Sequence, residues 1–222
     1  MKETSRLTIT ISRQLGSGGS YLGYITAKEL GFKYIDREIL RQAAERFGTD
    51  AGALAYMDER SPDLLETVMK GFSFGMPEMS VAPLGSPPIY HKELFNMECR
   101  IMNEIADRYN AVIVGRGGFY ALKNRSDVLR LFVYAPEEFR VKRIMEAQDI
   151  KEFKEVKNKV KESDQRRAKF IRDMTGTDWM DSRNYQLCID SSIFEFSEIA
   201  SLIIKAVKKK SGYPLDGNEP IA

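Results

Sequence analysis

Five short runs of apolar residues recur along the chain, and each is continuous rather than alternating with polar positions. The runs are rich in β-branched and aromatic side chains, which is typical of strands buried on both faces of a parallel sheet. The pattern therefore predicts buried strands at residues 7–12, 33–36, 111–115, 129–135 and 186–190.

Apolar positions at three- and four-residue spacing lie between these runs and predict helices. The clearest are residues 20–30, which stop at Gly31, residues 95–109, a helix opened by Pro136, and residues 194–209. Proline favours the first turn of a helix, and glycine favours the position just past its end. Strands that alternate with helices predict an α/β fold with a mostly parallel sheet.

Two long stretches interrupt this alternation. Residues 37–94 are too many for one crossover helix and contain a proline-rich tract, so they predict an insertion, and long loops in compact domains are often functional. Residues 146–180 are charged and mostly helical in pattern, and they predict a protruding arm or lid. Residues 211–222 predict a disordered tail.

Composition narrows the class of protein. The chain has 222 residues, 43% of them hydrophobic and 30% charged, which predicts one folded domain rather than a disordered chain. The net charge of +2 is too even to indicate a nucleic acid or a membrane as a partner. No apolar run approaches the ~18 residues of a membrane span, and the N-terminus lacks the apolar core of a secretory signal. We therefore expect a cytoplasmic protein.

Cysteine and histidine usage excludes further classes. Cys99 and Cys188 are too few for a disulfide framework or a cysteine metal cluster, and we expect both to be buried apolar thiols. The only histidine, His91, excludes multi-histidine zinc sites and is not accompanied by a Ser or Cys nucleophile signature.

The first strand runs into the sequence G-S-G-G-S, which is followed by a helix. Glycines in this place let backbone N–H groups converge on an anion at a helix N-terminus, where the helix dipole also favours negative charge. The alternative is a glycine-rich turn without a ligand. Because strand, loop and helix occur in the required order, we predict phosphate binding by Gly16, Ser17, Gly18, Gly19 and Ser20.

The loop lacks the usual lysine. In the register of the standard phosphate loop, G-x-x-x-x-G-K-[ST], this chain reads R-x-x-x-x-G-G-S. Ser20 keeps the hydroxyl position, a candidate Mg²⁺ ligand, but Gly19 stands in place of the lysine. A preorganised cation is worth about 10²–10³ in rate at a charged transition state. Another cation must replace the lysine if the loop supports phosphoryl transfer, and Arg13 is the nearest candidate.

Further polar residues follow the predicted strands, and ligands of open α/β sheets lie beyond these carboxyl ends. Asp36 and Arg37 follow the second strand, and Arg116 lies between glycines after the third. We predict that Arg37 and Arg116 grip a phosphate and that Asp36 orients a hydroxyl or holds Mg²⁺ through water. The alternatives are a loop salt bridge for Arg116 and a helix cap for Asp36.

Basic residues recur from the fourth strand into the arm. Arg140 and Arg143 lie one helical turn apart, and Arg166 and Arg167 lie in the sequence ESDQRRAKF. A charge run is usually a solvated helix face. The functional alternative is a mobile arm that closes over a polyphosphate, supplies the charge that Gly19 does not, and excludes water. Acidic residues interleaved in the arm argue against nucleic acid.

The chain resembles the cytidylate kinase-like family, a divergent branch of the nucleoside monophosphate kinases, from about residue 8 to 205. The resemblance lies in ITISRQLGSGGSYLG, YIDREIL, VIVGRGGFYAL, LRLFVYAPEEFRVKRI, DQRRAKF and NYQLCIDSS. It implies a three-layer P-loop kinase fold with a five-stranded parallel sheet, and ATP, Mg²⁺ and a cytidylate-type acceptor. It also implies a core at residues 7–36, 95–145 and 181–210, a monophosphate-binding insertion at 37–94 and a lid at 146–180.

The resemblance also implies roles for single residues. Residues 16–20 match the family's phosphate loop, and Asp36 and Arg116 match an acidic residue after the second strand and the arginine of a Gly-Arg-Asp segment. Arginines after the fourth strand and in the lid are matched by Arg140, Arg143 and either Arg166 or Arg167.

Three positions depart from authentic cytidylate kinases. Gly19 replaces the loop lysine, a change that the divergent branch shares. Gly117 replaces the aspartate of Gly-Arg-Asp, and Arg37 replaces the serine after Asp36. The last two positions contact the acceptor in true cytidylate kinases.

The sequence thus predicts ATP-dependent phosphoryl transfer to a nucleoside monophosphate, cytidylate by resemblance, with no nucleic-acid or membrane partner. One alternative is a kinase of a small hydroxylated metabolite, in which Asp36 acts as a base or orienter. Another is a non-catalytic nucleotide-binding module, with Gly19 marking lost chemistry. In the kinase hypotheses the transferring group is stabilised by Arg13, Arg140, Arg143, Arg166 and Arg167.

Overall fold

The computed structural model describes residues 6–36 and 92–211. Within these residues, five strands form one parallel sheet in the order β2-β3-β1-β4-β5. Each strand lies within one residue, at both ends, of a strand that the apolar runs predict, so the α/β fold with a parallel sheet is confirmed. The strands are β1 (Thr8–Arg13), β2 (Lys33–Ile35), β3 (Ala111–Val114), β4 (Val128–Tyr134) and β5 (Leu187–Asp190).

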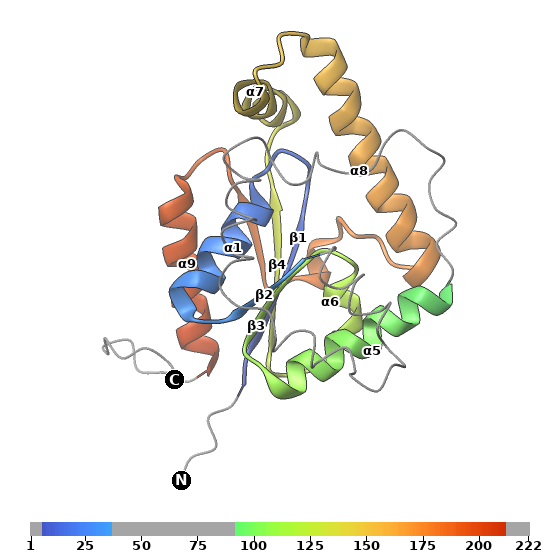
Figure 1. The fold of residues 1–222 in the computed structure, drawn as a ribbon, viewed down its shortest axis with the longest axis vertical. Coiled ribbons are helices and arrows are strands. Elements are labelled where there is room, and N and C mark those ends of the chain that lie inside the picture. Colours follow the sequence, from blue (N-terminus) through green and yellow to red (C-terminus); the bar gives the residue numbers. More distant parts are fainter. Residues whose placement is uncertain (1–5, 37–91, 212–222) are drawn as a thin grey trace.

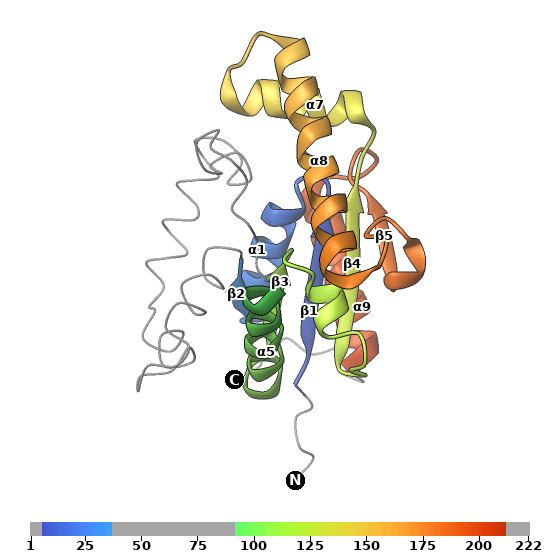
Figure 2. The same ribbon diagram turned by 90° about the vertical axis from the view of Figure 1, so that its right-hand side faces the viewer.

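Helices cover both faces of the sheet, which gives three layers (Figure 1, Figure 2). The helices α1 (Gly19–Leu30) and α9 (Phe196–Ser211) pack on one face, and α5 (Lys92–Arg108) and the short α6 (Gly118–Ala121) pack on the other. Past the carboxyl end of β4, α7 (Glu137–Gln148) leads into α8 (Phe153–Thr175), which runs back down the α5 side of the molecule. A 3₁₀ turn, η1 (Ser182–Asn184), precedes β5.

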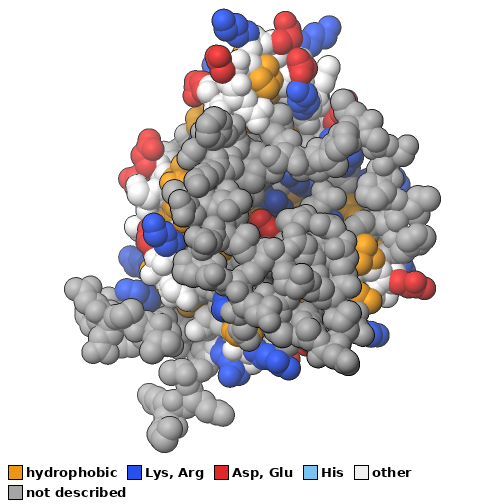
Figure 3. Space-filling view, in the orientation of Figure 1, with side chains coloured by type: hydrophobic (Ala, Val, Ile, Leu, Met, Phe, Trp, Pro, Cys, Tyr) orange, Lys and Arg blue, Asp and Glu red, His pale blue; other side chains and the backbone are white. Residues whose placement is uncertain are grey.

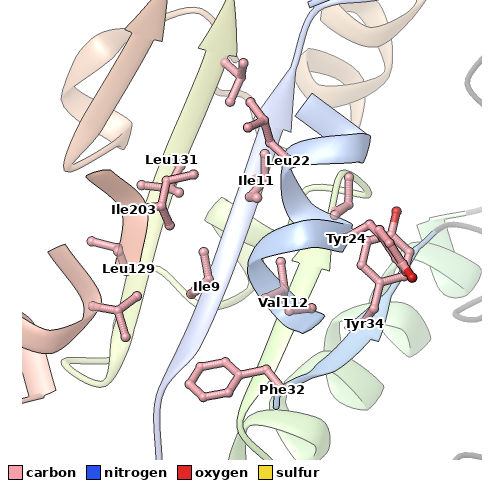
Figure 4. Packing of buried hydrophobic residues seen from close by; sticks show 14 of the residues in the cluster. Ile9, Ile11, Leu22, Tyr24, Phe32, Tyr34, Val112, Leu129, Leu131 and Ile203 are labelled. Atoms are coloured by element: carbon pink, nitrogen blue, oxygen red, sulfur yellow. The ribbon is translucent and has the colours of Figure 1, made fainter. Parts of the chain in front are cut away.

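The strand register aligns apolar side chains in rows on the face covered by α1 and α9. Ile9 of β1 lies between Val112 of β3 and Leu129 of β4, and the same buried cluster includes Leu22 of α1 and Ile203 of α9 (Figure 4). Burying an aliphatic side chain of this size contributes about 1.5–3 kcal/mol. Because β1 is paired on both sides, the loop that follows it starts from a firmly held strand.

An aromatic cluster anchors the lower end of the arm. Trp179, which follows α8, packs edge-to-face on Phe132 of β4 with ring centroids 5.5 Å apart. Tyr185 donates a 2.6 Å hydrogen bond from its hydroxyl to the carbonyl oxygen of Trp179. The indole Nε1 is buried and has no hydrogen-bond partner among the described residues. The end of α8 is therefore fixed to the sheet by packing.

Three predicted helix boundaries shift by two or three residues. The helix α5 begins at Lys92 rather than at residue 95. The helix α9 begins at Phe196 rather than at residue 194, and it continues to Ser211, the first residue of the predicted tail. The rest of the predicted insertion and of the predicted tail lies outside the described residues. No helix in the described ranges is long and apolar enough to cross a bilayer.

The two cysteines differ in their surroundings, and one expectation was wrong. Cys188 is exposed, whereas Cys99 is partly buried. The strand β5 lies at the edge of the sheet and only Ile189 within it is buried, so its apolar run did not indicate coverage of both faces. Burial and the neighbouring charge of Glu98 raise the pKa of Cys99 to about 11.

We expect the two thiols to react with an aromatic disulfide reagent at clearly different rates at pH 8. The thiolate is the reacting form, and the raised pKa of Cys99 leaves about one thiol in a thousand ionised at that pH. Burial raises the pKa of Cys188 as well, but its exposed sulfur is accessible. Two fast thiols in the native protein would contradict this expectation, and Cys188→Ser should remove the faster phase.

Candidate phosphate-binding site

The loop between β1 and α1 adopts a conformation that requires glycine. Gly16 and Gly18 have φ angles of +81° and +78°, a region that side chains disfavour. A Cβ atom at Gly16 would lie 2.9 Å from the Arg140 carbonyl oxygen, and one at Gly18 would overlap the Phe196 ring. The glycines that predict this loop are therefore demanded by both backbone angle and space.

The amino end of α1 is buried and has no side-chain cap. Gly18 occupies the N-cap position and provides no side-chain hydrogen bond to the first turn. Ser17 is buried and donates from its hydroxyl to the Gln14 carbonyl oxygen at 2.9 Å, which closes the loop on itself. The helix has 12 residues, so a full helix dipole adds to the backbone N–H groups at this end.

Arg13 lies in the space that a loop lysine would need. A Cβ atom at Gly19 would be 2.5 Å from Arg13 Cβ, and one at Gly115 would overlap Arg13 Nη1. Arg13 Nε donates to the Ser20 hydroxyl at 3.2 Å. The arginine side chain thus crosses the start of α1 and reaches the carboxyl end of β3. With Arg13 in this place, a lysine at residue 19 would clash with it.

Arg116 stands in a strained turn after β3. Gly115, Arg116 and Gly117 are three consecutive residues with positive φ, at +80°, +53° and +71°. A non-glycine residue held there costs on the order of 1–3 kcal/mol, and such strain is concentrated at functional sites. The turn carries the Arg116 guanidinium over the Phe170 ring of α8, 4.9 Å from its centroid.

Glu98 on α5 holds the Arg116 guanidinium in a two-pronged salt bridge. Arg116 Nη2 donates to the carboxylate at 2.9 Å and Nε donates at 3.2 Å. The side chains of Arg116 and Glu98 are only 11% and 1% exposed. The structure therefore realises the loop salt bridge, and acceptor binding by Arg116 stays a prediction. Glu98 was missed, although an acidic residue within the apolar stripe of this helix was a readable signal.

Arg143 ties the loop to the end of β5. Its guanidinium lies between the rings of Phe139 and Phe196, 4.5 and 4.7 Å from their centroids. It donates to the carbonyl oxygens of Ser17 at 3.1 Å and Ser191 at 3.2 Å. Burial lowers the pKa of Arg143, and stacking on aromatic rings offsets part of the desolvation of a cation.

Arg140 is part of the frame behind the loop. It is 5% exposed, and it donates to the carbonyl oxygens of Ala135 and Leu15, each at 2.9 Å. It also pairs with Asp164 of α8 at 2.8 Å. The structure thus brings Arg140 and Arg143 to the same loop, as their spacing predicts, but both contact its carbonyl oxygens.

The remaining predicted residues are spread around this edge of the sheet. Arg166 is exposed on α8, and Arg167 lies 3.5 Å from Asp164. Asp36 follows β2 and is partly buried, and Arg37 lies outside the described residues. Ser20 is buried with its hydroxyl accepting from Arg13.

The charges of the arm are largely balanced on its surface. Lys157 and Lys161 both lie within 4 Å of Glu137, and Lys169 pairs with Asp173 at 2.8 Å. Figure 3 shows basic and acidic side chains interleaved at the tip formed by α7 and α8. Most of the basic run is therefore a solvated helix face, whereas Arg167 pairs with Asp164, which contacts the loop.

The Ser20 hydroxyl is the candidate direct ligand of Mg²⁺ that the sequence predicts. The Ser20 hydroxyl sits at the first turn of α1, where a phosphate-loop serine binds the ion together with phosphate oxygens. Among the described residues, no group of three or more His, Cys, Asp or Glu side chains could hold a metal ion alone. The donor set fits an ion held chiefly by a nucleotide's phosphates.

A glycine loop and helix after the central strand of a five-stranded parallel sheet define the class: this is a P-loop kinase fold. The model of the cytidylate kinase-like family matches residues 8–193. The chain belongs to the cytidylate kinase-like family, as the sequence resemblance predicts. Family and fold together support a kinase-type enzyme that binds a nucleotide.

Individual similar proteins are distant. The S-adenosylmethionine-dependent nucleotide dehydratase of Lacinutrix mariniflava is 26% identical over 205 residues, which cover 91% of this chain but 36% of that protein. A protein of unknown function from Eubacterium ventriosum superposes with a TM-score of 0.66 at 19% identity, covering 91% of this chain and 99% of that one. A gluconokinase from Sinorhizobium meliloti superposes with a TM-score of 0.51 at 13% identity, covering 95% and 96%.

Proposed function

We propose that this protein transfers the terminal phosphoryl group of ATP to a nucleoside monophosphate, CMP or dCMP, and releases ADP and the nucleoside diphosphate. The observation that carries the proposal is the placement of Arg13 beside Gly19 at the uncapped amino end of α1. This placement supplies a cation at the phosphate loop where the lysine is missing. A loop without any cation would fit only a binding module.

Different residues of the site bind ATP, the metal ion and the acceptor. Backbone N–H groups of the loop bind the phosphates of ATP, except that of Ser17, which donates to the Gln14 carbonyl oxygen. Arg13 neutralises charge that spreads over the transferring group. The Ser20 hydroxyl would hold Mg²⁺ together with phosphate oxygens, and bound Mg²⁺ would supply further positive charge. Arg116 and Arg37 bind the acceptor phosphate. The acceptor is already ionised, so no general base is required.

A nucleotide acceptor is favoured over other metabolites by family membership. It also agrees with the similarity to a protein whose name describes action on a nucleotide, although the chain spans only about a third of that protein. In the metabolite alternative Asp36 would have to activate a hydroxyl.

An acceptor screen tests the proposal. The protein is incubated with ATP, Mg²⁺ and each common nucleoside monophosphate, and the nucleotides are separated by anion-exchange chromatography. We expect a diphosphate product with CMP or dCMP at the highest kcat/KM. No diphosphate from any monophosphate would refute the proposal, and tight ATP binding without turnover would identify the non-catalytic module.

The Asp36→Asn variant separates the two kinase hypotheses. In nucleoside monophosphate transfer we expect a smaller loss of turnover, because the attacking oxygen is an ionised phosphate. With a hydroxylated metabolite as acceptor, loss of a base or orienting carboxylate typically costs about 10²–10⁴-fold. Turnover that disappears in Asp36→Asn would therefore favour the metabolite kinase.

A further inference from the structure

The phosphate loop is held from its carbonyl side by two arginines of α7. Arg140 Nη1 donates to the Leu15 carbonyl oxygen at 2.9 Å, and Arg143 Nη1 donates to the Ser17 carbonyl oxygen at 3.1 Å. In a planar trans peptide the C=O and the following N–H point in opposite directions. Binding these two carbonyl oxygens therefore turns the N–H groups of Gly16 and Gly18 away from the arginines, toward the side where a phosphate would lie.

Asp164 connects this loop to the arm. Its Oδ1 accepts a hydrogen bond from the Leu15 N–H at 3.1 Å, and its Oδ2 accepts from Arg140 Nη1 at 2.8 Å. Arg167 lies on the same helix 3.5 Å away. Leu15 and Asp164 are separated by 149 positions in the sequence. One carboxylate thus binds a loop N–H and the guanidinium that holds the carbonyl oxygen of the same residue.

A carboxylate in this position requires an explanation. Its side chain is mostly buried, and burial raises the pKa of Asp164 while Arg140 and Arg167 oppose that shift. Burying a charge is unfavourable unless it is paired and hydrogen-bonded. A negative charge beside a phosphate site would also repel the ligand, unless its charge is neutralised and it serves to fix the site.

We propose that Asp164 is a positioning residue that makes the shape of the phosphate loop depend on the docking of α8. Val156 and Val160 of α8 pack against Val141 and Ile144 of α7 in one buried cluster, which brings the helix to the loop. With α8 in place, Asp164 binds the Leu15 N–H and keeps Arg140 on the Leu15 carbonyl oxygen. The inference rests on the proposed phosphate loop but needs no contact between Asp164 and the nucleotide.

The Asp164→Asn variant tests the inference, with Asp173→Asn as the matched control on the same helix. Asp173 pairs only with an exposed lysine at the surface among the described contacts. The probe is inorganic tripolyphosphate with Mg²⁺, titrated calorimetrically. We expect at least a tenfold weaker affinity in Asp164→Asn, because the hydrogen bonds that hold Leu15 and Arg140 lose their charged acceptor. We expect a change below twofold in Asp173→Asn.

Amide exchange provides a second measurement, made on the wild-type protein and on the variant. In the wild-type protein the Leu15 amide should be protected as strongly as the backbone of α8 around residue 164, because both open when α8 leaves. In Asp164→Asn, amides of residues 14–18 should exchange faster while those of β1 stay protected. This pattern distinguishes a positioning role from global destabilisation.

The outcomes separate this inference from the proposed activity. Unchanged tripolyphosphate affinity in Asp164→Asn, or a Leu15 amide that exchanges as freely as an open loop, would overturn the inference. Wild-type protein that binds tripolyphosphate but phosphorylates no acceptor would refute the kinase activity and leave the inference standing. Wild-type protein that does not bind tripolyphosphate would overturn both.

Discussion

Replacing Arg13 with alanine should lower kcat for phosphoryl transfer by about 10²–10³-fold, the usual cost of removing a preorganised charge at the transition state. The reason is its position: the side chain fills the space beside Gly19 and bonds the Ser20 hydroxyl. Steady-state kinetics with the best acceptor of the screen measure the effect. The exposed arginine of α5, altered in Arg100→Ala, is the control and should change kcat less than twofold.

Moving the cation from residue 13 to residue 19 tests whether Arg13 replaces the missing lysine. Gly19→Lys alone should be less active and less stable than wild type, because its Cβ would lie 2.5 Å from Arg13 Cβ. The double variant Arg13→Gly, Gly19→Lys removes the Arg13 Cβ atom that causes this clash and restores a lysine to the loop. We expect its kcat to be at least tenfold higher than that of Arg13→Ala. Full activity in Arg13→Ala, or a double variant no better than it, would show that Arg13 does not replace the lysine.

Glu98→Ala should destabilise the fold by about 3–5 kcal/mol, the usual result of removing one partner of a buried ion pair. Its carboxylate is 1% exposed and receives two hydrogen bonds from Arg116, which stands in a strained turn. The free energy of unfolding is measured by urea titration. Without the carboxylate, the strained turn loses the contact that holds its guanidinium.

Glu93→Ala is the matched control for this measurement. Glu93 lies on the same helix, in its first turn, and is exposed. A carboxylate there interacts with the helix dipole, which is worth about 0.3–1 kcal/mol. Equal destabilisation by both variants would mean that Glu98 contributes through helix charge rather than through Arg116.

The sheet could be predicted from the sequence because its strands are short, continuous and apolar. The three inner strands, β1, β3 and β4, are buried along most of their length, which produces this pattern. Edge position is not encoded in such a run, which is why Cys188 of β5 is exposed although burial was expected. The pattern indicates strands reliably, and the neighbours of each strand only indirectly.

The glycine loop could also be predicted, because the order of strand, loop and helix and the spacing of the glycines determine its geometry. The groups that the arginines bind could not be predicted. Arg140 and Arg143 were expected to face a transferring phosphate, and in the structure they bind carbonyl oxygens of the loop. The sequence does not distinguish an arginine that binds a phosphate from one that binds backbone carbonyl oxygens. The difference depends on contacts between residues more than a hundred positions apart.

The roles of the acidic residues Asp164 and Glu98 could not be predicted from the sequence either. Each is an acidic residue in a helix rich in charges, and the sequence assigned a role to neither. Asp164 opens the segment DQRRAKF, and Glu98 is an acidic position within an apolar stripe. Their importance comes from burial beside an arginine of another element.

The packing of Trp179 makes the protein its own optical reporter. It is the only tryptophan of the chain, it lies just past α8, and its indole is buried against Phe132. Indole emission shifts to longer wavelength when water reaches the ring. The detachment of the arm from the sheet can therefore be followed by intrinsic fluorescence in stopped-flow mixing, with no dye attached and no residue replaced.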